Sequence, residues 1–139
     1  MEKTCEKDNG LTVSVKSFSY KRGIPYDATG HGGGFVFDCR SINNPGRYDE
    51  FKNLTGKDVE VENFLLNNSG VLEFLELAEK LVSLSVKEYI QLGYAHLEVN
   101  FGCTGGQHRS VYCAENMAKF LKDKFPNVNV ELKHMELKK

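Results

Sequence analysis

The sequence lacks several features that would each mark a class of protein. No apolar run approaches the roughly 20 residues of a transmembrane helix, and the first eight residues contain no apolar core of a secretion signal, so we expect neither a membrane span nor export. The formal net charge is only -1, which provides no overall attraction to nucleic acid. The four cysteines form no Cys-x-x-Cys pair and no metal-ligand spacing. We therefore expect reduced thiols in a cytoplasmic protein, with no metal and no cofactor.

The composition is that of an ordinary globular domain. Hydrophobic residues make up 40% of the 139 residues and charged residues 27%, and no internal repeat is visible. Residues 1–10 are polar and are expected to be disordered. Residues 11–139 are expected to form one domain.

Strand-type and helix-type patterns alternate along this domain. Strands are predicted at 11–20, 35–39, 96–101 and 127–133, and helices at 58–65, 70–93 and 111–125. Asp58 is expected to cap the first helix and Gly93 to end the second. The second helix is expected to bury one stripe, namely Leu72, Leu75, Ala78, Val82, Val86, Tyr89 and Ile90. This order predicts an α/β fold with a mostly parallel sheet and flanking helices.

One glycine-rich segment resembles a nucleotide loop and is interpreted otherwise. Gly30-His31-Gly32-Gly33-Gly34 has no strand-then-helix context, and it lacks the Gly-Lys-[Ser/Thr] end of a P-loop. We interpret it as a flexible insertion.

The chemistry is concentrated between residues 102 and 110, in Gly102-Cys103-Thr104-Gly105-Gly106-Gln107-His108-Arg109-Ser110. A strand precedes this segment and a helix follows it, so the loop amides and the helix N-terminus favour an anion. Arg109 adds a planar fork of donors that suits a phosphate. The same positive field would lower the pKa of the Cys103 thiol. The sequence therefore predicts a phosphate-type loop between a central strand and a helix.

Two alternatives remain open at this loop. Cys103, Gly106, Arg109 and Ser110 fit the pattern Cys-x-x-Gly-x-x-Arg-[Ser/Thr] of cysteine-dependent phosphatases, in which the cysteine attacks phosphorus. Such an enzyme needs a general acid, for which Asp38, Asp49 and His108 are candidates. Alternatively, the glycines only turn a strand into a helix and Cys103 is a buried small residue. We expect anion binding with Cys103 as a structural or weakly reactive thiol rather than an essential nucleophile, and we assign no catalytic residue.

Asp38 and Arg40 are predicted to complete the pocket; the alternatives are a loop-capping carboxylate for Asp38 and a surface salt bridge for Arg40. If residues 35–39 run parallel to residues 97–101, these two side chains reach the same rim of the sheet as Cys103 and Arg109. The predicted anion-binding residues are Asp38, Arg40, Cys103, Thr104, Gly105, Gly106, Gln107, His108, Arg109 and Ser110.

Five stretches together resemble the RapZ family of bacterial RNase adapter proteins, in its C-terminal domain. They are Tyr20-Lys21-Arg22-Gly23-Ile24-Pro25, Phe35-Val36-Phe37-Asp38-Cys39-Arg40, Asn44-Pro45, Leu54-Thr55-Gly56, and Gly102 to Tyr112. The resemblance implies phosphosugar sensing, small-RNA binding in enterobacterial members, and an N-terminal P-loop domain that this sequence does not contain. A P-loop or kinase-like domain elsewhere in the protein or on another chain is the implied partner. The leading interpretation is thus a phosphate- or phosphosugar-binding regulatory domain.

The sequence also departs from the family pattern. A ligand-contacting His is implied after Asn44-Pro45 for enterobacterial members, whereas Gly46-Arg47 stands here. His31, in the glycine-rich insertion, is a further residue that could approach the site. The RNA-binding tail is implied to be strongly basic, whereas here acids interrupt Lys133, Lys138 and Lys139. An RNA- or protein-docking module is therefore the third interpretation, with weak, nonspecific RNA contacts.

Overall fold

A computed structural model describes residues 10–137, and nearly all of the segment expected to be disordered lies outside that range. The elements in chain order are β1 Thr12–Ser19, β2 Gly34–Asp38, the 3-10 turns η1 Pro45–Arg47 and η2 Asp49–Phe51, α1 Val59–Asn68, α2 Val71–Leu92, β3 His96–Cys103, α3 Arg109–Lys124 and β4 Asn129–His134. The predicted strands and helices are all present, with small shifts at their ends. In the described range, no helix is both long and apolar enough to cross a membrane.

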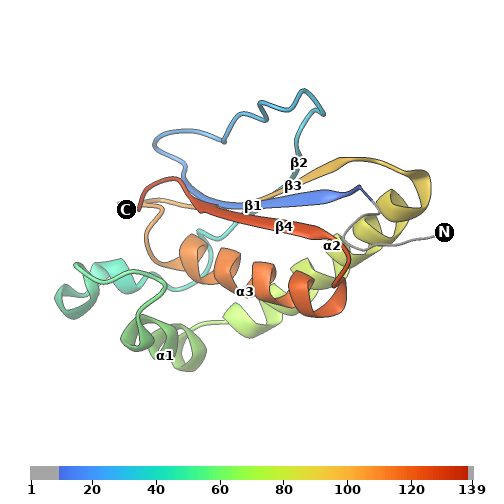
Figure 1. Cartoon of the computed structure of the whole chain (residues 1–139). Coiled ribbons are helices and arrows are strands. Elements are labelled where there is room, and N and C mark those ends of the chain that lie inside the picture. Colours follow the sequence, from blue (N-terminus) through green and yellow to red (C-terminus); the bar gives the residue numbers. More distant parts are fainter. Residues whose placement is uncertain (1–9, 138–139) are drawn as a thin grey trace.

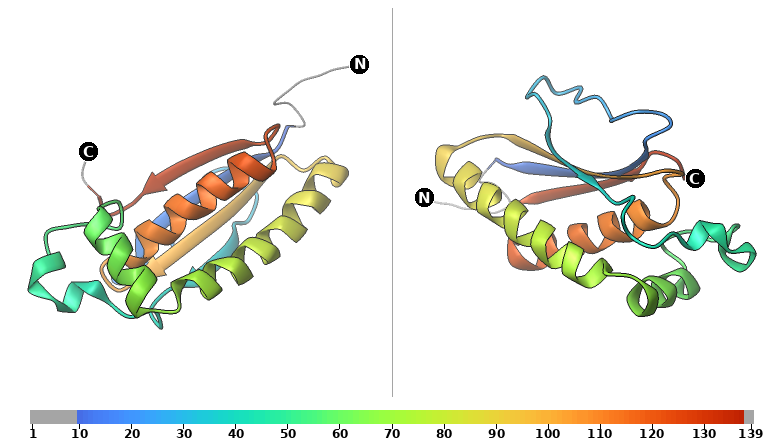
Figure 2. Two further views of the ribbon diagram at one scale, coloured as in Figure 1. Left: turned by 90° about the horizontal axis from the view of Figure 1, so that it is seen from below. Right: turned by 180° about the vertical axis from the view of Figure 1, so that it is seen from behind.

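The four strands form one parallel sheet in the order β2-β3-β1-β4. All three helices lie on one face, while the segment that joins β1 to β2 crosses the opposite face (Figures 1 and 2). This arrangement follows from handedness: the β1–β2 connection moves across the sheet in the opposite sense to the β3–β4 connection, so a right-handed crossover places it on the other side. The fold is α/β, as predicted, and every strand pair is parallel.

The hydrophobic core lies between the sheet and the helices. Alternate residues of β1 and β3 point into it, and α2 and α3 contribute the facing stripe; the fully or nearly buried members include Val13, Val15, Leu97, Val99, Phe101, Leu75, Val82, Val86, Met117 and Leu121. Leu72 was predicted to lie on this buried stripe, but that prediction is wrong because Leu72 is 57% exposed in the first turn of α2. Gly93 does end α2, in the left-handed conformation at φ 74°.

Asp58 differs in detail from its predicted role. It occupies the N-cap position of α1, but its carboxylate makes no capping hydrogen bond to the helix. Instead Oδ2 accepts from the Thr55 amide at 2.7 Å. Asp58 therefore fixes the turn before the helix, and this turn borders the site described below.

The face of the sheet opposite the helices is polar, and Asp27 anchors the segment that crosses it. The Asp27 carboxylate accepts from the Thr29 amide at 2.9 Å, the Thr29 hydroxyl at 2.5 Å and the Gly33 amide at 2.8 Å. The glycine-rich insertion is therefore gathered around one carboxylate. These contacts give residues 27–33 a defined place over the sheet.

Candidate functional site

The register of β2 on β3 brings the predicted rim residues together. Asp38 is the register partner of Gly102, and the Cys39 amide donates to the Gly102 carbonyl at 2.8 Å. On the core side, Phe37 stacks on Phe101 with ring centroids 5.2 Å apart, which stabilises this register. The prediction that β2 and β3 end at a common rim is confirmed.

The loop between β3 and α3 presents a run of free backbone amides. Among residues 10–137, no backbone carbonyl accepts from the N–H groups of residues 104–107. Thr104, Gly105 and Gln107 are exposed, and α3 starts directly afterwards with His108 as N-cap and no acidic residue in its first turn. The positive end of α3 therefore acts without a neighbouring carboxylate on its first turn. These are the features expected of an anion-binding loop, and that role stays a prediction.

Neighbouring segments bind three of the carbonyl groups at this loop. The Cys103 carbonyl accepts from the Tyr20 amide at 3.0 Å, and the Thr104 carbonyl accepts from the Ser19 hydroxyl at 2.5 Å. On the other side, the Gln107 carbonyl accepts from the Gly56 amide at 2.8 Å. Because these three carbonyls are engaged inside the protein, they do not compete with the amides of residues 104–107 for a ligand.

The two loop glycines have different roles. Gly106 is buried at φ 73°, and a Cβ there would lie 2.7 Å from Cγ of Glu136 and 3.0 Å from the Ser19 nitrogen. Gly105 has no positive φ, and a Cβ there would meet nothing within 4 Å. Of these two glycines, Gly106 is therefore the one whose left-handed backbone requires glycine.

Arg109 is buried at the base of the rim rather than exposed beside the loop. Its side chain donates from Nη1 to the carbonyls of Arg40 and Ile42, at 2.9 Å each, and its Nε has no partner in the described structure. The residue is 4% exposed. Arg109 thus ties α3 to the segment that follows β2, and its grip on a phosphoryl group stays a prediction.

Asp38 and Arg40 form a two-pronged ion pair on the rim. Arg40 donates from Nε to Oδ1 at 2.9 Å and from Nη2 to Oδ2 at 2.7 Å, and its guanidinium lies 3.9 Å from the centroid of the Tyr20 ring. The hydrogen bond from Arg40 lowers the pKa of Asp38, with Arg109 adding a smaller effect. Burial, followed by the Asp38 charge, raises the pKa of Tyr20. Tyr20 was not predicted as a site residue, although it opens the family-like stretch Tyr20 to Pro25, which could have signalled it.

This pair gives a direct pH prediction. A carboxyl group with a lowered folded-state pKa stabilises the fold above its unfolded pKa, and that contribution is lost as the pH falls through the folded value. The two side chains are half exposed, so the effect on stability should stay below about 1 kcal/mol. Carboxyl-carbon NMR titration should place the pKa of Asp38 below the usual 3.8, and Arg40→Ala should move it upward. An unchanged value in Arg40→Ala would refute the assignment.

Cys103 is a buried thiol at the end of β3. It is 2% exposed, and its Sγ lies 3.1 Å from the Ser110 hydroxyl. Cys39 and Cys113 are also buried nearby, and the hydrogen bond with Cys113, together with burial, raises the pKa of Cys39 well above its usual value. The structural role predicted for Cys103 agrees with this burial, while its reactivity stays untested.

The three candidate general acids are all engaged elsewhere. Asp38 is paired with Arg40, and Asp49 is exposed on η2 beside Lys52 at 3.0 Å. His108 bonds through Nε2 to the Phe51 carbonyl at 2.9 Å. Each of the three therefore has a partner within the described structure, and the hydrolysis alternative stays untested.

The turn around Thr55 and the segment around Gly46 border the loop. Gly46 packs against His108, because a Cβ on Gly46 would lie 3.4 Å from the His108 Nδ1. Beside Gln107 lies a groove of about 500 Å3, which Thr55, Lys57, Asp58, Glu136 and Leu137 complete. Lys57 is an exposed cation that sequence reasoning missed as a site residue.

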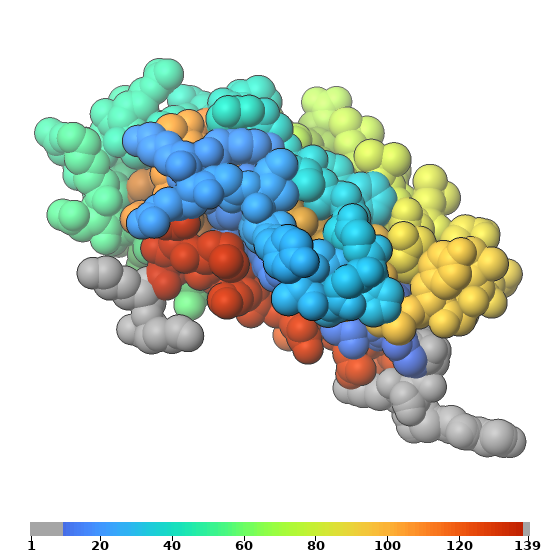
Figure 3. Space-filling model, turned by 90° about the horizontal axis from the view of Figure 1, so that it is seen from above, coloured from blue at the N-terminus to red at the C-terminus, as the bar shows by residue number. Residues whose placement is uncertain are grey.

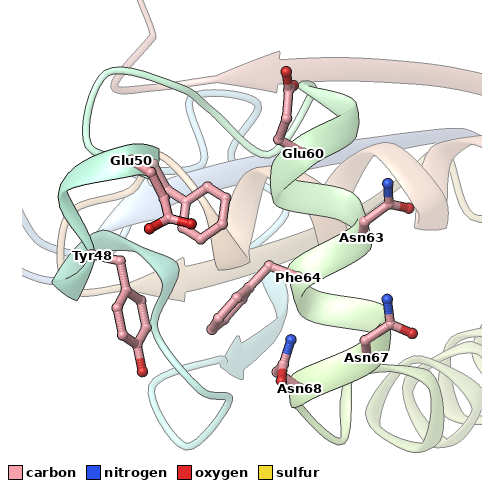
Figure 4. Close-up of a pocket in the computed structure, with 8 residues that line it drawn as sticks. Tyr48, Glu50, Glu60, Asn63, Phe64, Asn67 and Asn68 are labelled. Atoms are coloured by element: carbon pink, nitrogen blue, oxygen red, sulfur yellow. The ribbon is translucent and has the colours of Figure 1, made fainter.

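A separate cavity of about 620 Å3 lies between the 3-10 turns and α1 (Figure 4). Its walls are aromatic, amide and acidic side chains: Tyr48, Glu50, Phe51, Glu60, Asn63, Phe64, Asn67 and Asn68. Two carboxylates and no cation make it a poor place for a phosphate. Its relation to the loop is indirect, through the Phe51 carbonyl that His108 contacts.

Of the predicted RNA contacts, the structure describes only one. Lys133 is exposed on the edge strand β4, whereas Lys138 and Lys139 lie outside the described residues. The RNA prediction is therefore untested.

The fold defines a class: a small parallel α/β domain whose central strand leads through a glycine-rich loop into a helix. The family model of the RapZ C-terminal domain matches residues 11–138, and the chain belongs to this family. It is 41% identical to a nucleotide-binding protein of Thermosipho melanesiensis and 40% identical to one of Thermotoga neapolitana. The matches cover 93% and 96% of this chain but only 46% and 45% of those relatives. The chain thus spans less than half the length of the relatives.

Proposed function

We propose that this chain is a regulatory domain that binds a small phosphorylated ligand, of the phosphosugar class, on the loop between β3 and α3. The observation that supports it most directly is the run of backbone amides at 104–107 that lack carbonyl partners within the described chain, next to the N-terminus of α3. Such amides bind a phosphoryl group through fixed partial charges. Arg109 adds positive charge from beneath the rim.

The rest of the ligand would lie toward the polar rim. Asp38 can accept from a sugar hydroxyl or amine, and Arg40 keeps that carboxylate ionised and in place. The groove beside Gln107 offers room on the other side, with Lys57 as a second cation. A phosphate with a polar, hydroxyl-bearing body fits these surroundings better than an apolar ester.

Family membership supports a regulatory or adapter role. The relatives are named nucleotide-binding proteins and are about twice as long as the matched region. We assign nucleotide binding to the parts of those proteins that lie outside the match, which agrees with a P-loop partner domain. A cytoplasmic location and weak RNA contacts stay predictions.

The test is a titration of 15N-labelled protein with inorganic phosphate, glucosamine-6-phosphate and unphosphorylated glucosamine. The two phosphorylated ligands should shift the amides of residues 104–109 most, and glucosamine should not. Gly105→Val should weaken binding at least tenfold with little change in stability, because its side chain would project into the open space that the ligand uses. Gly70→Val is the matched control, since Gly70 also has open space and a negative φ far from the loop.

A variant that is expected to raise the affinity for phosphate provides a second test of the site. Glu136 packs against Gly106, so its carboxylate opposes an anion on the loop. Glu136→Gln should therefore raise phosphate affinity a few fold, and Arg40→Ala should lower it by leaving Asp38 unpaired. Largest shifts outside residues 38–40 and 102–111, or wild-type binding in Gly105→Val, would refute the proposed site.

A cysteine-dependent phosphatase is the second candidate, favoured by the 3.1 Å approach of the Ser110 hydroxyl to Cys103 Sγ. Aryl phosphate hydrolysis distinguishes it. Turnover that disappears in Cys103→Ser while phosphate binding persists would promote this function over ligand sensing.

A further inference from the structure

A cluster of metal-ligand side chains lies on the polar face of the sheet, away from the phosphate-type loop. His96 and Glu98 are alternate residues at the start of β3 and so point to the same face. Asp27 approaches them from the segment that crosses this face. Figure 3 looks onto the face and shows that segment, in blue, spread over the strands.

The three side chains converge within ligand distance of one another. Nε2 of His96 lies 2.7 Å from Oε2 of Glu98 and 3.9 Å from Oδ1 of Asp27. One ligand atom from each residue lies within 4.8 Å of the others. The exposed fraction of the side chain is 9% for His96, 3% for Glu98 and 5% for Asp27. A nitrogen and two oxygens therefore face one partly enclosed point.

Each carboxylate is oriented by a second contact, as in built metal sites. Lys16 binds Oε1 of Glu98 at 3.1 Å, which leaves Oε2 toward His96. The Thr29 and Gly33 amides and the Thr29 hydroxyl fix both oxygens of Asp27.

A second imidazole lies beside the cluster. The rings of His31 and His96 stack with centroids 5.5 Å apart and an angle of 26° between their planes. Nδ1 of His31 is engaged by the Thr29 hydroxyl at 2.8 Å, while its Nε2 has no partner among the described residues. A groove of about 520 Å3 borders Asp27 and offers a way in for an ion.

We propose that Asp27, His96 and Glu98 bind a divalent transition-metal ion, with Zn2+ as the favoured ion and His31 as an additional ligand. Imidazole nitrogen with carboxylate oxygen suits Zn2+, whereas Mg2+ and Ca2+ prefer oxygen alone. The ion takes the place of the proton between His96 and Glu98. It clamps residues 27–33 onto the sheet.

This site is separate from the proposed phosphate site. Glu98 and Cys103 are five residues apart on one strand, or roughly 17 Å at the usual rise per residue. Failure of one site therefore leaves the other testable. Sequence spacing could not predict the cluster, because Asp27 lies about 70 positions from its partners.

The experiment is calorimetric titration of tag-free, chelator-treated protein with ZnCl2, in a Cys5→Ser background that removes one thiol outside the described residues. One equivalent should bind, and a large excess of Mg2+ should not displace it. Asp27→Asn and His96→Gln should each weaken Zn2+ binding at least tenfold. His31→Ala, at an exposed position that does not threaten folding, should weaken it less.

His134→Gln is the matched control. His134 contacts Glu115 at 2.7 Å and Ser17 at 2.7 Å, so it is a strand histidine with one carboxylate partner instead of two. Its substitution should leave Zn2+ affinity unchanged, and bound Zn2+ should leave phosphate titration unchanged. Absence of one-equivalent binding would overturn the proposal. Wild-type affinity in both His96→Gln and His31→Ala would do so as well.

Discussion

Replacing Arg109 with alanine is expected to lower the free energy of unfolding by about 3 kcal/mol, one of the two largest effects predicted for this protein. The Arg109 guanidinium makes two charge-assisted hydrogen bonds to the carbonyls of Arg40 and Ile42, and the residue is 4% exposed. Alanine would leave both carbonyls without this donor and a cavity under the rim. Urea denaturation followed by circular dichroism measures the change.

Two controls separate stability from ligand binding. Arg22 is an exposed arginine whose side chain is 76% accessible, and Arg22→Ala should change stability by less than about 0.5 kcal/mol. Arg109→Lys keeps the charge but loses the planar fork, so its free energy of unfolding should lie between those of the wild type and Arg109→Ala. If Arg109→Ala has the wild-type free energy of unfolding but no longer binds phosphate, Arg109 acts in ligand binding and the structural role proposed here is wrong.

The burial of Arg109 also shows where sequence reasoning reached its limit. Its position in the first turn of α3 was predicted from the apolar spacing that follows it. The direction of its side chain was not, because that depends on where the chain after β2 places the Arg40 and Ile42 carbonyls. The pattern of residue types predicts on which element a side chain lies. Its direction depends on hydrogen-bond partners that lie far away along the chain.

The rim itself was predictable for a simple reason. Two apolar strands separated by helices form a parallel pair, and parallel strands end on one side, so Asp38 had to approach Gly102 once the pairing was assumed. The insertion was less predictable. Its glycines suggested flexibility, whereas one acceptor, Asp27, gathers the segment through three hydrogen bonds. Local composition carries no signal for such an anchor on the opposite face of the sheet.

Glycine positions show the same contrast at finer scale. The sequence pattern includes Gly106 and not Gly105, but it does not say which of them adopts a positive φ; in the structure only Gly106 does. Gly56 was named only as part of a family-like stretch, whereas in the structure its amide supports the loop by donating to the Gln107 carbonyl. The requirement for glycine there comes from close approach to α3, which only the folded arrangement reveals.

Gly56→Ala is accordingly expected to destabilise the protein by about 2–3 kcal/mol and to weaken phosphate binding as well. A Cβ on Gly56 would overlap the His108 carbonyl and would lie 2.5 Å from the Tyr112 nitrogen. These are the two partners of the first hydrogen bond of α3, at 3.0 Å. Since both are backbone atoms, a side-chain rotation cannot relieve the overlap, and the turn at residue 56 must move away from the loop.

The movement would also break the support of the loop. The Gly56 amide would leave the Gln107 carbonyl, so the neighbouring amides would lose their fixed direction toward a ligand. Gly105→Ala is the control, because its Cβ meets open space and its φ is not positive. Chemical denaturation and phosphate titration should show Gly56→Ala impaired in both and Gly105→Ala of normal stability. Normal stability in Gly56→Ala would contradict the close packing of this turn against α3.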